Sequence, residues 1–295
     1  MVEFEIGIDG GGTSTLAVVA RAGGAVIGRG TAGPSALGQG IAAAWAHIDA
    51  AITSAFTAAD LPTPATSRCA LAAGLSGVNH APWREAFVRQ NSGFAKLAVE
   101  TDAFIALLGA HDGQPGVIVA AGTGSVGEVW HADGSRAEAS GWGFPCGDEG
   151  SGAWLGFCAV RHTQCVLDGR ATSSVLAQKV MQRCGDSRAA FQQWSLESRQ
   201  FEFAQLAPLV FAAAEDEGDE VALGLLKQGA AELQRLAVAL DATQSLPVAI
   251  CGSIATRLHI WFDAAFRARC VAPATDAATG ALHLLRLPKL LEGKA

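Results

Sequence analysis

Clustered positive charge is the first thing that this sequence lacks. Only 17% of its 295 residues are charged, the formal net charge is −7, and no stretch concentrates lysine or arginine. A protein that follows a phosphate backbone needs a basic patch or stripe. The composition therefore excludes nucleic acid as an expected partner.

Long apolar runs are also missing. No window approaches the roughly 18 uninterrupted apolar residues of a membrane-spanning helix. The first residues, Met1 to Asp9, carry glutamates where a secretion signal would carry a basic region. We therefore expect a soluble cytoplasmic protein with no membrane partner.

Paired cysteine motifs are absent as well. The seven cysteines are scattered, and no two are separated by two residues (Cys69, Cys146, Cys158, Cys165, Cys184, Cys251 and Cys270). His162 and Cys165 have the spacing of one helical face, with Cys158 nearby, but two or three ligands without a fourth make a poor zinc site. Free thiols in a reducing compartment are the expected state.

Apolar residues, in contrast, are abundant and make up 50% of the chain. This composition excludes disorder, and the length favours two units of about 100 to 200 residues each. A polar stretch marked by Gly and Pro, Asp112 to Gly116, predicts the boundary. We expect an N-terminal unit over 1–112, a C-terminal unit over 113–276, and a final helix over about 277–295 that completes the first unit.

Two glycine loops each lie between apolar runs. Asp9 to Thr13 separates the alternating run that starts at Val2 from a second run ending at Ala20. About 110 residues later, Gly122 to Ser125 lies between two similar runs. The pattern predicts strand, loop and strand in both places.

Helical periodicity or strong helix formers cover much of the remaining chain. Helices are predicted for residues 41–56, 104–111, 151–167, 173–183, 203–214, 221–240 and 253–268, and further strands for 69–73, 97–99 and 247–251. Duplicated hairpins followed by helices favour a mixed α/β fold with a cleft between two halves.

The two loops have the composition of phosphate-binding turns. Glycines let backbone amides approach an anion, because no Cβ atoms obstruct them. The candidate phosphate-binding residues are Gly10, Gly11, Gly12, Thr13, Gly122, Thr123 and Gly124. Asp9 adds a carboxylate for Mg²⁺, held through water. A dinucleotide fingerprint would need a helix after the first loop, where a strand is predicted; an ordinary hairpin turn stays open as the alternative.

Asp102 is the candidate general base. It follows the apolar strand 97–99 and opens the helix 104–111, so its carboxylate is placed to accept a proton from an attacking hydroxyl. The same position suits a helix N-cap, a role that aspartate fills readily. Both interpretations stay open, and one side chain can serve both purposes.

The segment from Gly141 to Ser151 has the composition of a sugar site. Trp142 offers a flat apolar surface, and Asp148 offers acceptors for hydroxyl groups. The alternative is a core tryptophan in a glycine-rich loop with a helix cap. Gly252 and Ser253, between a predicted strand and a helix, are a weaker candidate for adenosine, because a simple turn also explains them.

These residues, in this order, resemble the N-acetylglucosamine kinases and the BadF and BadG type activator ATPases of the sugar kinase, actin and heat-shock chaperone superfamily. The resemblance covers nearly the whole chain. It implies a two-lobed ribonuclease H-like fold, as in actin-like ATPases, with duplicated mixed-sheet lobes around an interlobe cleft. It also implies ATP and Mg²⁺ as cofactors, a homodimer, and phosphorylation of N-acetylglucosamine at O6.

Residue roles follow from the same resemblance. The two glycine loops match the first and second phosphate motifs, and Gly252 with Ser253 matches the adenosine motif. Asp102 matches the catalytic aspartate. The residues that match the sugar pocket are Ser76, Asp102, Thr123, Trp142 and Asp148.

Three departures keep alternatives open. Ala36 stands where the family usually places a sugar-contacting asparagine, which makes glucosamine an alternative substrate. Cys251 replaces the first glycine of the adenosine motif. The chain shows no equivalent of the cysteines that hold an iron–sulfur cluster in the activator ATPases, so a small-molecule kinase is favoured over a switch acting on a protein partner.

Overall fold

The protein is an α/β chain that divides into two compact units, as a computed structural model describing residues 1–287 shows. Unit 1 comprises Met1–Gly116, Trp130–Arg136 and the described part of the segment that begins at Ala272. Unit 2 comprises Val117–Val129 and Ala137–Val271. No helix within residues 1–287 combines the length and apolarity needed to cross a bilayer.

Unit 1 is built on a five-stranded sheet in the order β3-β2-β1-β4-β5. Its strands are β1 (Phe4–Gly10), β2 (Thr15–Arg21), β3 (Val26–Ala32), β4 (Cys69–Leu75) and β5 (Lys96–Glu100). β1 is antiparallel to β2 and parallel to β4, which is in turn parallel to β5. The helices are α1 (Ile41–Ala58), α2 (Ala81–Arg89), α3 (Asp102–Ala110) and α12 (Ala277–Arg286), with short 3-10 turns at Leu37–Gln39 and Thr66–Arg68.

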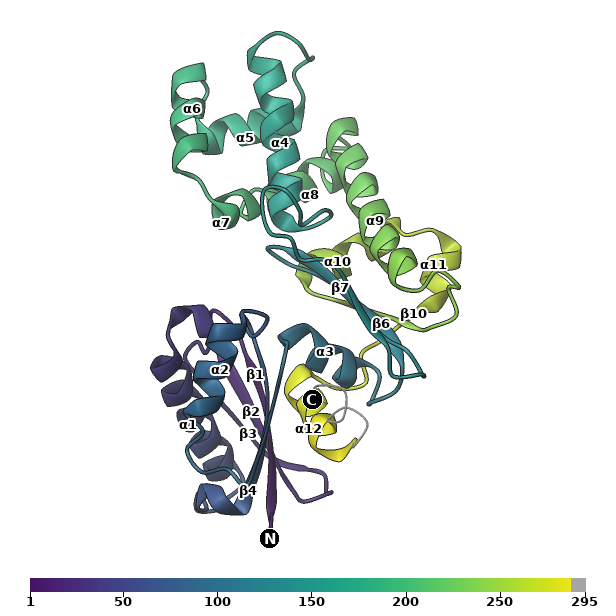
Figure 1. Cartoon of the computed structure of the whole chain (residues 1–295). Helices are drawn as coiled ribbons and strands as arrows, with labels where there is room; N and C mark the ends of the chain where they lie inside the picture. The colour runs from purple at the N-terminus through teal and green to yellow at the C-terminus, as the bar shows by residue number, and fades with distance from the viewer. Residues whose placement is uncertain (288–295) are drawn as a thin grey trace. The chain divides into compact units, whose positions relative to one another are not determined.

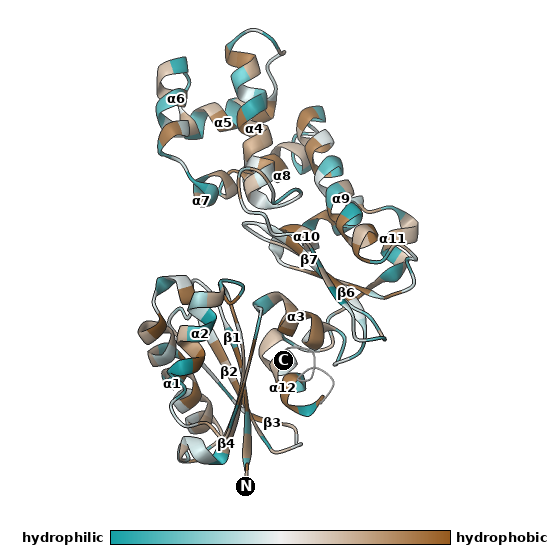
Figure 2. Ribbon diagram, viewed as in Figure 1, coloured by the Kyte–Doolittle hydropathy of each residue, from teal (hydrophilic) through white to brown (hydrophobic). Residues whose placement is uncertain are grey.

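Helices cover both faces of this sheet: α1 and α2 lie on one side, and α3 and α12 on the other (Figure 1). Alternating strand residues such as Ile6 and Ile8 are fully buried against Ile48 and Phe56 of α1. On the other face α12 packs so closely that a Cβ at Gly7 would collide with the carbonyl of Ala278. Apolar colour accordingly follows the strands, while the helices alternate apolar and polar surfaces (Figure 2).

Unit 2 repeats the same strand order with different helices. Its sheet runs β10-β9-β6-β7-β8. Read from the other edge, the order is β8-β7-β6-β9-β10, so β6 to β10 correspond in turn to β1 to β5 of unit 1. The strands are β6 (Gly116–Ala121), β7 (Ser125–Trp130), β8 (Arg136–Ser140), β9 (Val248–Cys251) and β10 (Cys270–Val271). The helices are α4 (Gly152–Leu167), α5 (Val175–Cys184), α6 (Arg188–Glu197), α7 (Gln200–Ala204), α8 (Ala207–Glu215), α9 (Glu220–Leu240), α10 (Ser253–Leu258) and α11 (Ala264–Arg269), with a 3-10 turn at His259–Trp261.

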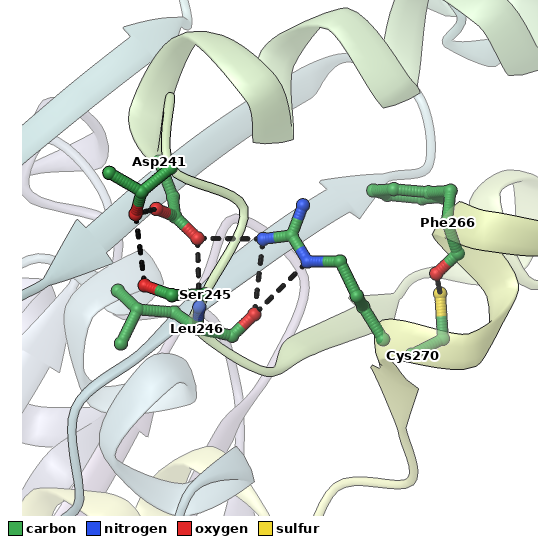
Figure 3. Close-up of polar contacts among 7 residues, drawn as sticks. Asp241, Ser245, Leu246, Phe266 and Cys270 are labelled. Carbon is green, nitrogen blue, oxygen red and sulfur yellow. Dashed lines mark hydrogen bonds and ion pairs between the residues drawn. The ribbon is translucent and has the colours of Figure 1, made fainter.

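A buried ion pair anchors the strand that leads to the predicted adenosine segment. The guanidinium of Arg269 donates to Asp241 Oδ2 (2.8 Å) and to the carbonyl of Leu246 (3.0 Å), and the amide of Leu246 donates to the same carboxylate (2.8 Å) (Figure 3). These contacts close the turn between α9 and β9. They hold the chain at Leu246, two residues before β9 begins.

The predicted α/β class, with two mixed sheets, is confirmed, as are both strand–loop–strand segments. Two predicted helices are wrong in their continuity. The helix expected over 203–214 is two helices, because Pro208 in the first turn of α8 lacks the amide that a continuing helix would need. The helix expected over 253–268 is interrupted, and Asp263 caps a new helix, α11. Of the predicted C-terminal helix, residues 277–286 form α12, and residues 288–295 lie outside the described part.

Candidate active site

In unit 1, the predicted site residues meet at one edge of the sheet. Parallel strands β1, β4 and β5 place their carboxyl ends together, and Asp9 is level with Gly74, which is level with Glu100. Asp9 lies at the end of β1, Ser76 directly after β4, and Asp102 two residues after β5. The carboxyl edge of a parallel sheet is where open α/β folds bind ligands.

The first glycine loop is held by hydrogen bonds to its carbonyl groups that leave its tip open. The carbonyl of Gly10 accepts from the amide of Ser76 (3.0 Å), and Gln39 Nε2 donates to the carbonyl of Gly12 (3.0 Å). A Cβ at Gly10 would collide with Ser35 and Leu75. Within residues 1–287 the amides of Gly12 and Thr13 donate to no protein acceptor, so both are available to an anion.

Asp9 and Asp102 form a pair of half-buried carboxylates. Burial, and after it the negative charges of Asp102 and Asp276, raise the pKa of Asp9 to about 6. Burial also raises the pKa of Asp102, against the hydrogen bond that its carboxylate accepts from the amide of Ala103 (2.9 Å). Carboxyl groups in this environment suit proton transfer or cation binding near neutral pH.

The helix cap of α3 is Thr101 and not Asp102. Thr101 Oγ1 accepts from the amide of Phe104 (3.0 Å), so Asp102 occupies the first helical position. The interpretation of Asp102 as the N-cap is therefore wrong, because a neighbouring hydroxyl already fills that role. The carboxylate of Asp102 therefore has no part in capping α3.

We expect Asp9→Asn to stabilise the protein in a pH-dependent way. The pKa of Asp9 is about 6 in the folded protein and 3.8 in the ordinary, unfolded environment. The stability that this difference contributes is therefore fully present below pH 3.8 and is lost as the pH rises through about 6. At pH 8 the substitution should raise the free energy of unfolding by about 1 to 3 kcal/mol, and near pH 4 by little. Urea denaturation at both pH values measures this. An equal difference at the two pH values would contradict it.

In unit 2, the second glycine loop and the adenosine candidate lie at one sheet edge. β6 is parallel to β9, with Ala120 level with Cys251, so Gly122 and Gly252 follow neighbouring strand ends. Gly252 has a φ of 86°, and a Cβ there would collide with the backbone of Ala121. Only glycine fits this conformation and this close approach.

The same loop is locked onto the start of α4. The amide of Gly122 donates to the carbonyl of Gly124 (2.9 Å), which closes a tight turn. The amides of Gly152 and Ala153 donate to the carbonyls of Gly122 (2.8 Å) and Thr123 (3.1 Å). The loop is therefore a rigid platform, and the Thr123 side chain is exposed on it.

The segment 141–150, which we name the sugar loop, presents its two candidate residues differently. Trp142 is 84% exposed, so the interpretation as a core tryptophan is wrong. Asp148 is buried, and its carboxylate accepts from the amide of Ser125 (3.1 Å) and from Gln200 Nε2 (2.7 Å). Ser151 caps α4, as the sequence predicts. An exposed indole beside a fixed carboxylate is a suitable surface for a sugar ring.

The predicted residues thus form two groups. Unit 1 brings together Asp9, Gly10, Gly11, Gly12, Thr13, Ser76 and Asp102, and unit 2 brings together Gly122, Thr123, Gly124, Trp142, Asp148, Gly252 and Ser253. Sequence reasoning did not predict the residues that hold these site residues in position. They are Ser35, Gln39, Thr101, Ser125 and Gln200. Only Thr101, a capping residue type at a helix start, gave a signal.

A known protein family matches most of the chain. The sequence profile of the BadF/BadG/BcrA/BcrD ATPase family matches residues 6–281. The chain belongs to this family. The match spans both glycine loops and both sheets, so all site residues described above lie within the family's domain.

Individual family relatives and structures resemble the chain over nearly its full length. The glucosamine kinase GspK of Vibrio cholerae is 31% identical over 98% of this chain and 97% of its own. The N-acetyl-D-glucosamine kinase of Dictyostelium discoideum is 27% identical over 88% of each chain. A solved Chromobacterium violaceum structure, provisionally named an N-acetylglucosamine kinase, is 45% identical with a TM-score of 0.88, covering 96% of this chain and 99% of its own.

Proposed function

We propose that this chain, an ATP-dependent sugar kinase, transfers the γ-phosphoryl group of MgATP to O6 of an amino sugar, with N-acetylglucosamine as the first candidate. The observation that carries the proposal is the pair of half-buried carboxylates, Asp9 and Asp102, beside a glycine loop with free amides. Phosphoryl transfer requires a phosphate cradle, a cation ligand and a base to position the hydroxyl.

In the proposed reaction Asp102 accepts the proton of the sugar O6 hydroxyl. A bond forms between O6 and the γ-phosphorus, the bond from that phosphorus to the β-γ bridging oxygen breaks, and ADP leaves. The loops at Gly10 to Thr13 and Gly122 to Gly124 bind the phosphates, and Gly252 with Ser253 binds the adenosine. Removing the proton as O6 attacks accelerates such a step by about 10²- to 10⁴-fold.

The residues present fit a magnesium ion. Within residues 1–287 no donor hydrogen-bonds the Asp9 carboxylate, and the charges that shift its pKa are those of two further carboxylates, Asp102 and Asp276. A half-buried, unpaired anion of this kind is stabilised by a divalent cation. Asp9 would hold Mg²⁺ through water, and the bound ion would neutralise charge on the phosphates.

The proposed sugar-binding residues are Ser76 and Asp102 in unit 1 and Thr123, Trp142 and Asp148 in unit 2. Trp142 would cover the apolar face of the ring, and Thr123 and Asp148 would accept or donate hydrogen bonds to its hydroxyls.

Glucosamine is the second candidate substrate. Ala36 follows Ser35 beside the first glycine loop and has no side-chain amide to offer to an N-acetyl group. The Vibrio cholerae relative is a glucosamine kinase by name. A protein-directed switch of the activator type is not favoured, since the kinase relatives match nearly the whole chain.

A coupled ADP-release assay across sugars tests the function. We expect turnover with N-acetylglucosamine or glucosamine in the presence of Mg²⁺, little with glucose, and none without the cation. Phosphorus NMR of the product identifies the phosphorylated hydroxyl. ATP hydrolysis that no amino sugar stimulates would refute the kinase assignment. Light scattering measures the homodimer, which we also propose.

A further inference from the structure

The sugar loop is joined to helix α7 by two separate contacts. Gln200, the first residue of α7, donates from its amide to Asp148 Oδ2 (2.7 Å). The ring of Phe144 packs on that of Phe203, also in α7, with centroids 5.0 Å apart. A polar contact and an apolar contact therefore bind the same loop to the same short helix.

Helix α7 is itself firmly placed. It packs so closely on α4 that a Cβ at Gly156 would collide with the carbonyl of Phe203. Its first turn is closed by the amide of Arg199, which donates to Glu202 Oε2 (2.8 Å). Gln200 thus projects from a fixed backbone, which makes its amide a directed donor.

The carboxylate of Asp148 depends on neutral donors. Its Oδ1 accepts from the amide of Ser125 and its Oδ2 from Gln200, and no ion pair reaches it within residues 1–287. Burial raises the pKa of Asp148, the amide of Ser125 lowers it, the charge of Glu149 raises it, and Gln200 lowers it. Removing the Gln200 amide leaves one oxygen of a buried anion without a protein donor.

We propose that Gln200 is a positioning residue of the kinase: it holds the Asp148 carboxylate ionised and oriented so that its remaining lone pairs accept sugar hydroxyls. The inference rests on the proposed sugar-binding role of Asp148. Each carboxylate oxygen has about two acceptor directions. One on each oxygen is occupied by the protein, which leaves the others for the substrate.

Two substitutions of Gln200 should act in opposite directions with pH. In Gln200→Ala the loss of a donor favours protonated Asp148, so kcat/KM for the sugar should fall about tenfold at the acid end and recover as pH rises. In Gln200→Glu two carboxylates face each other, so kcat/KM should fall as pH rises and the second group ionises. KM for ATP should change less than about twofold in both, since the contact is on the sugar side.

Gln193→Ala provides the matched control. Gln193 also donates its side-chain amide to a carboxylate, that of Glu197, but on the exposed surface of α6. Its pH profile should match that of the unsubstituted protein. If Gln200 only held α7 in place, its substitution would lower stability without opposite slopes of kcat/KM against pH. Parallel pH profiles for Gln200→Ala, Gln200→Glu and the unsubstituted enzyme would overturn the proposal.

A double-mutant cycle separates this inference from the proposed function. Thermal unfolding of Gln200→Ala, Asp148→Asn and the double variant measures the energy of this contact without any substrate. We expect the changes in the free energy of unfolding of the two single variants to be non-additive in the double variant. Additive effects would reject the positioning role even if no amino sugar were turned over. Turnover of an amino sugar by the unsubstituted chain, together with additive effects, would reject the inference and leave the proposed function intact.

Discussion

Asp102→Asn is expected to lower kcat by about 10²- to 10⁴-fold while the fold and the affinity for ATP are preserved. The substitution keeps the shape of the side chain and removes only the capacity to accept a proton that the proposed reaction requires of it. Thr101 remains to cap α3, so no helix contact is lost. Because burial raises the pKa of Asp102, loss of the charge should leave stability unchanged or slightly raised. Steady-state kinetics and thermal unfolding measure the two effects.

Asp133→Asn is the control for this prediction. Asp133 accepts hydrogen bonds from Ser135 in an exposed turn and has no part in the carboxyl edge of either sheet. Its kcat should stay within about twofold of normal, as for most surface substitutions. If Asp102→Asn instead retained near-normal kcat, the base would have to be another group, and Asp9 would be the next candidate.

The sequence predicted the parts of the site that local chemistry determines. Asp9 and the glycines after it are recognisable because apolar strands flank them on both sides. Asp102 is recognisable because a strand ends and a helix begins around it. These signals depend on neighbouring residues, and the strand register then aligns them at one edge.

The sequence did not predict the contacts that fix these residues in place. Gln200 is 52 positions from Asp148, and nothing local marks a glutamine at a helix start as a partner for a distant carboxylate. Trp142 could equally have been buried, since exposure depends on what packs around the loop. The break between α7 and α8 was not predicted because the apolar periodicity continues across it. Pro208, in the first turn of α8, is the residue that prevents one continuous helix.

The repeated strand order explains why one chain offers two loops of the same kind. In unit 1 the loop joins β1 to β2, and in unit 2 it joins β6 to β7, which are the corresponding strands. The segments after β4 and β9 also correspond: one carries Ser76, the other Gly252. The same position in the repeated sheet thus holds a proposed sugar contact in unit 1 and a proposed adenosine contact in unit 2. The large helical region, α4 to α9, distinguishes unit 2, and its helix α7 supports the sugar loop that precedes α4.

Gly124→Ala tests whether the second loop and the sugar loop function as one structure. A Cβ at Gly124 would lie 2.8 Å from Asp148 Oδ1 and 3.0 Å from its Cγ, closer than such atoms normally approach. The carboxylate is tied to Ser125 and Gln200, so it can move away only by giving up one of those bonds. We expect kcat/KM for the sugar to fall about 10²-fold, as misplacement by about 1 Å typically produces.

Gly224→Ala is the matched control for Gly124→Ala. Gly224 lies in α9, where an added Cβ meets nothing within 4 Å, so alanine should keep full activity and raise stability by up to about 1 kcal/mol. Asp148 lies at the end of a side chain and not in the backbone, so Gly124→Ala should still fold cooperatively in thermal unfolding. A variant that folds normally and phosphorylates the sugar at the normal rate would show that the carboxylate can move without loss, and Asp148 would then not be a fixed sugar ligand.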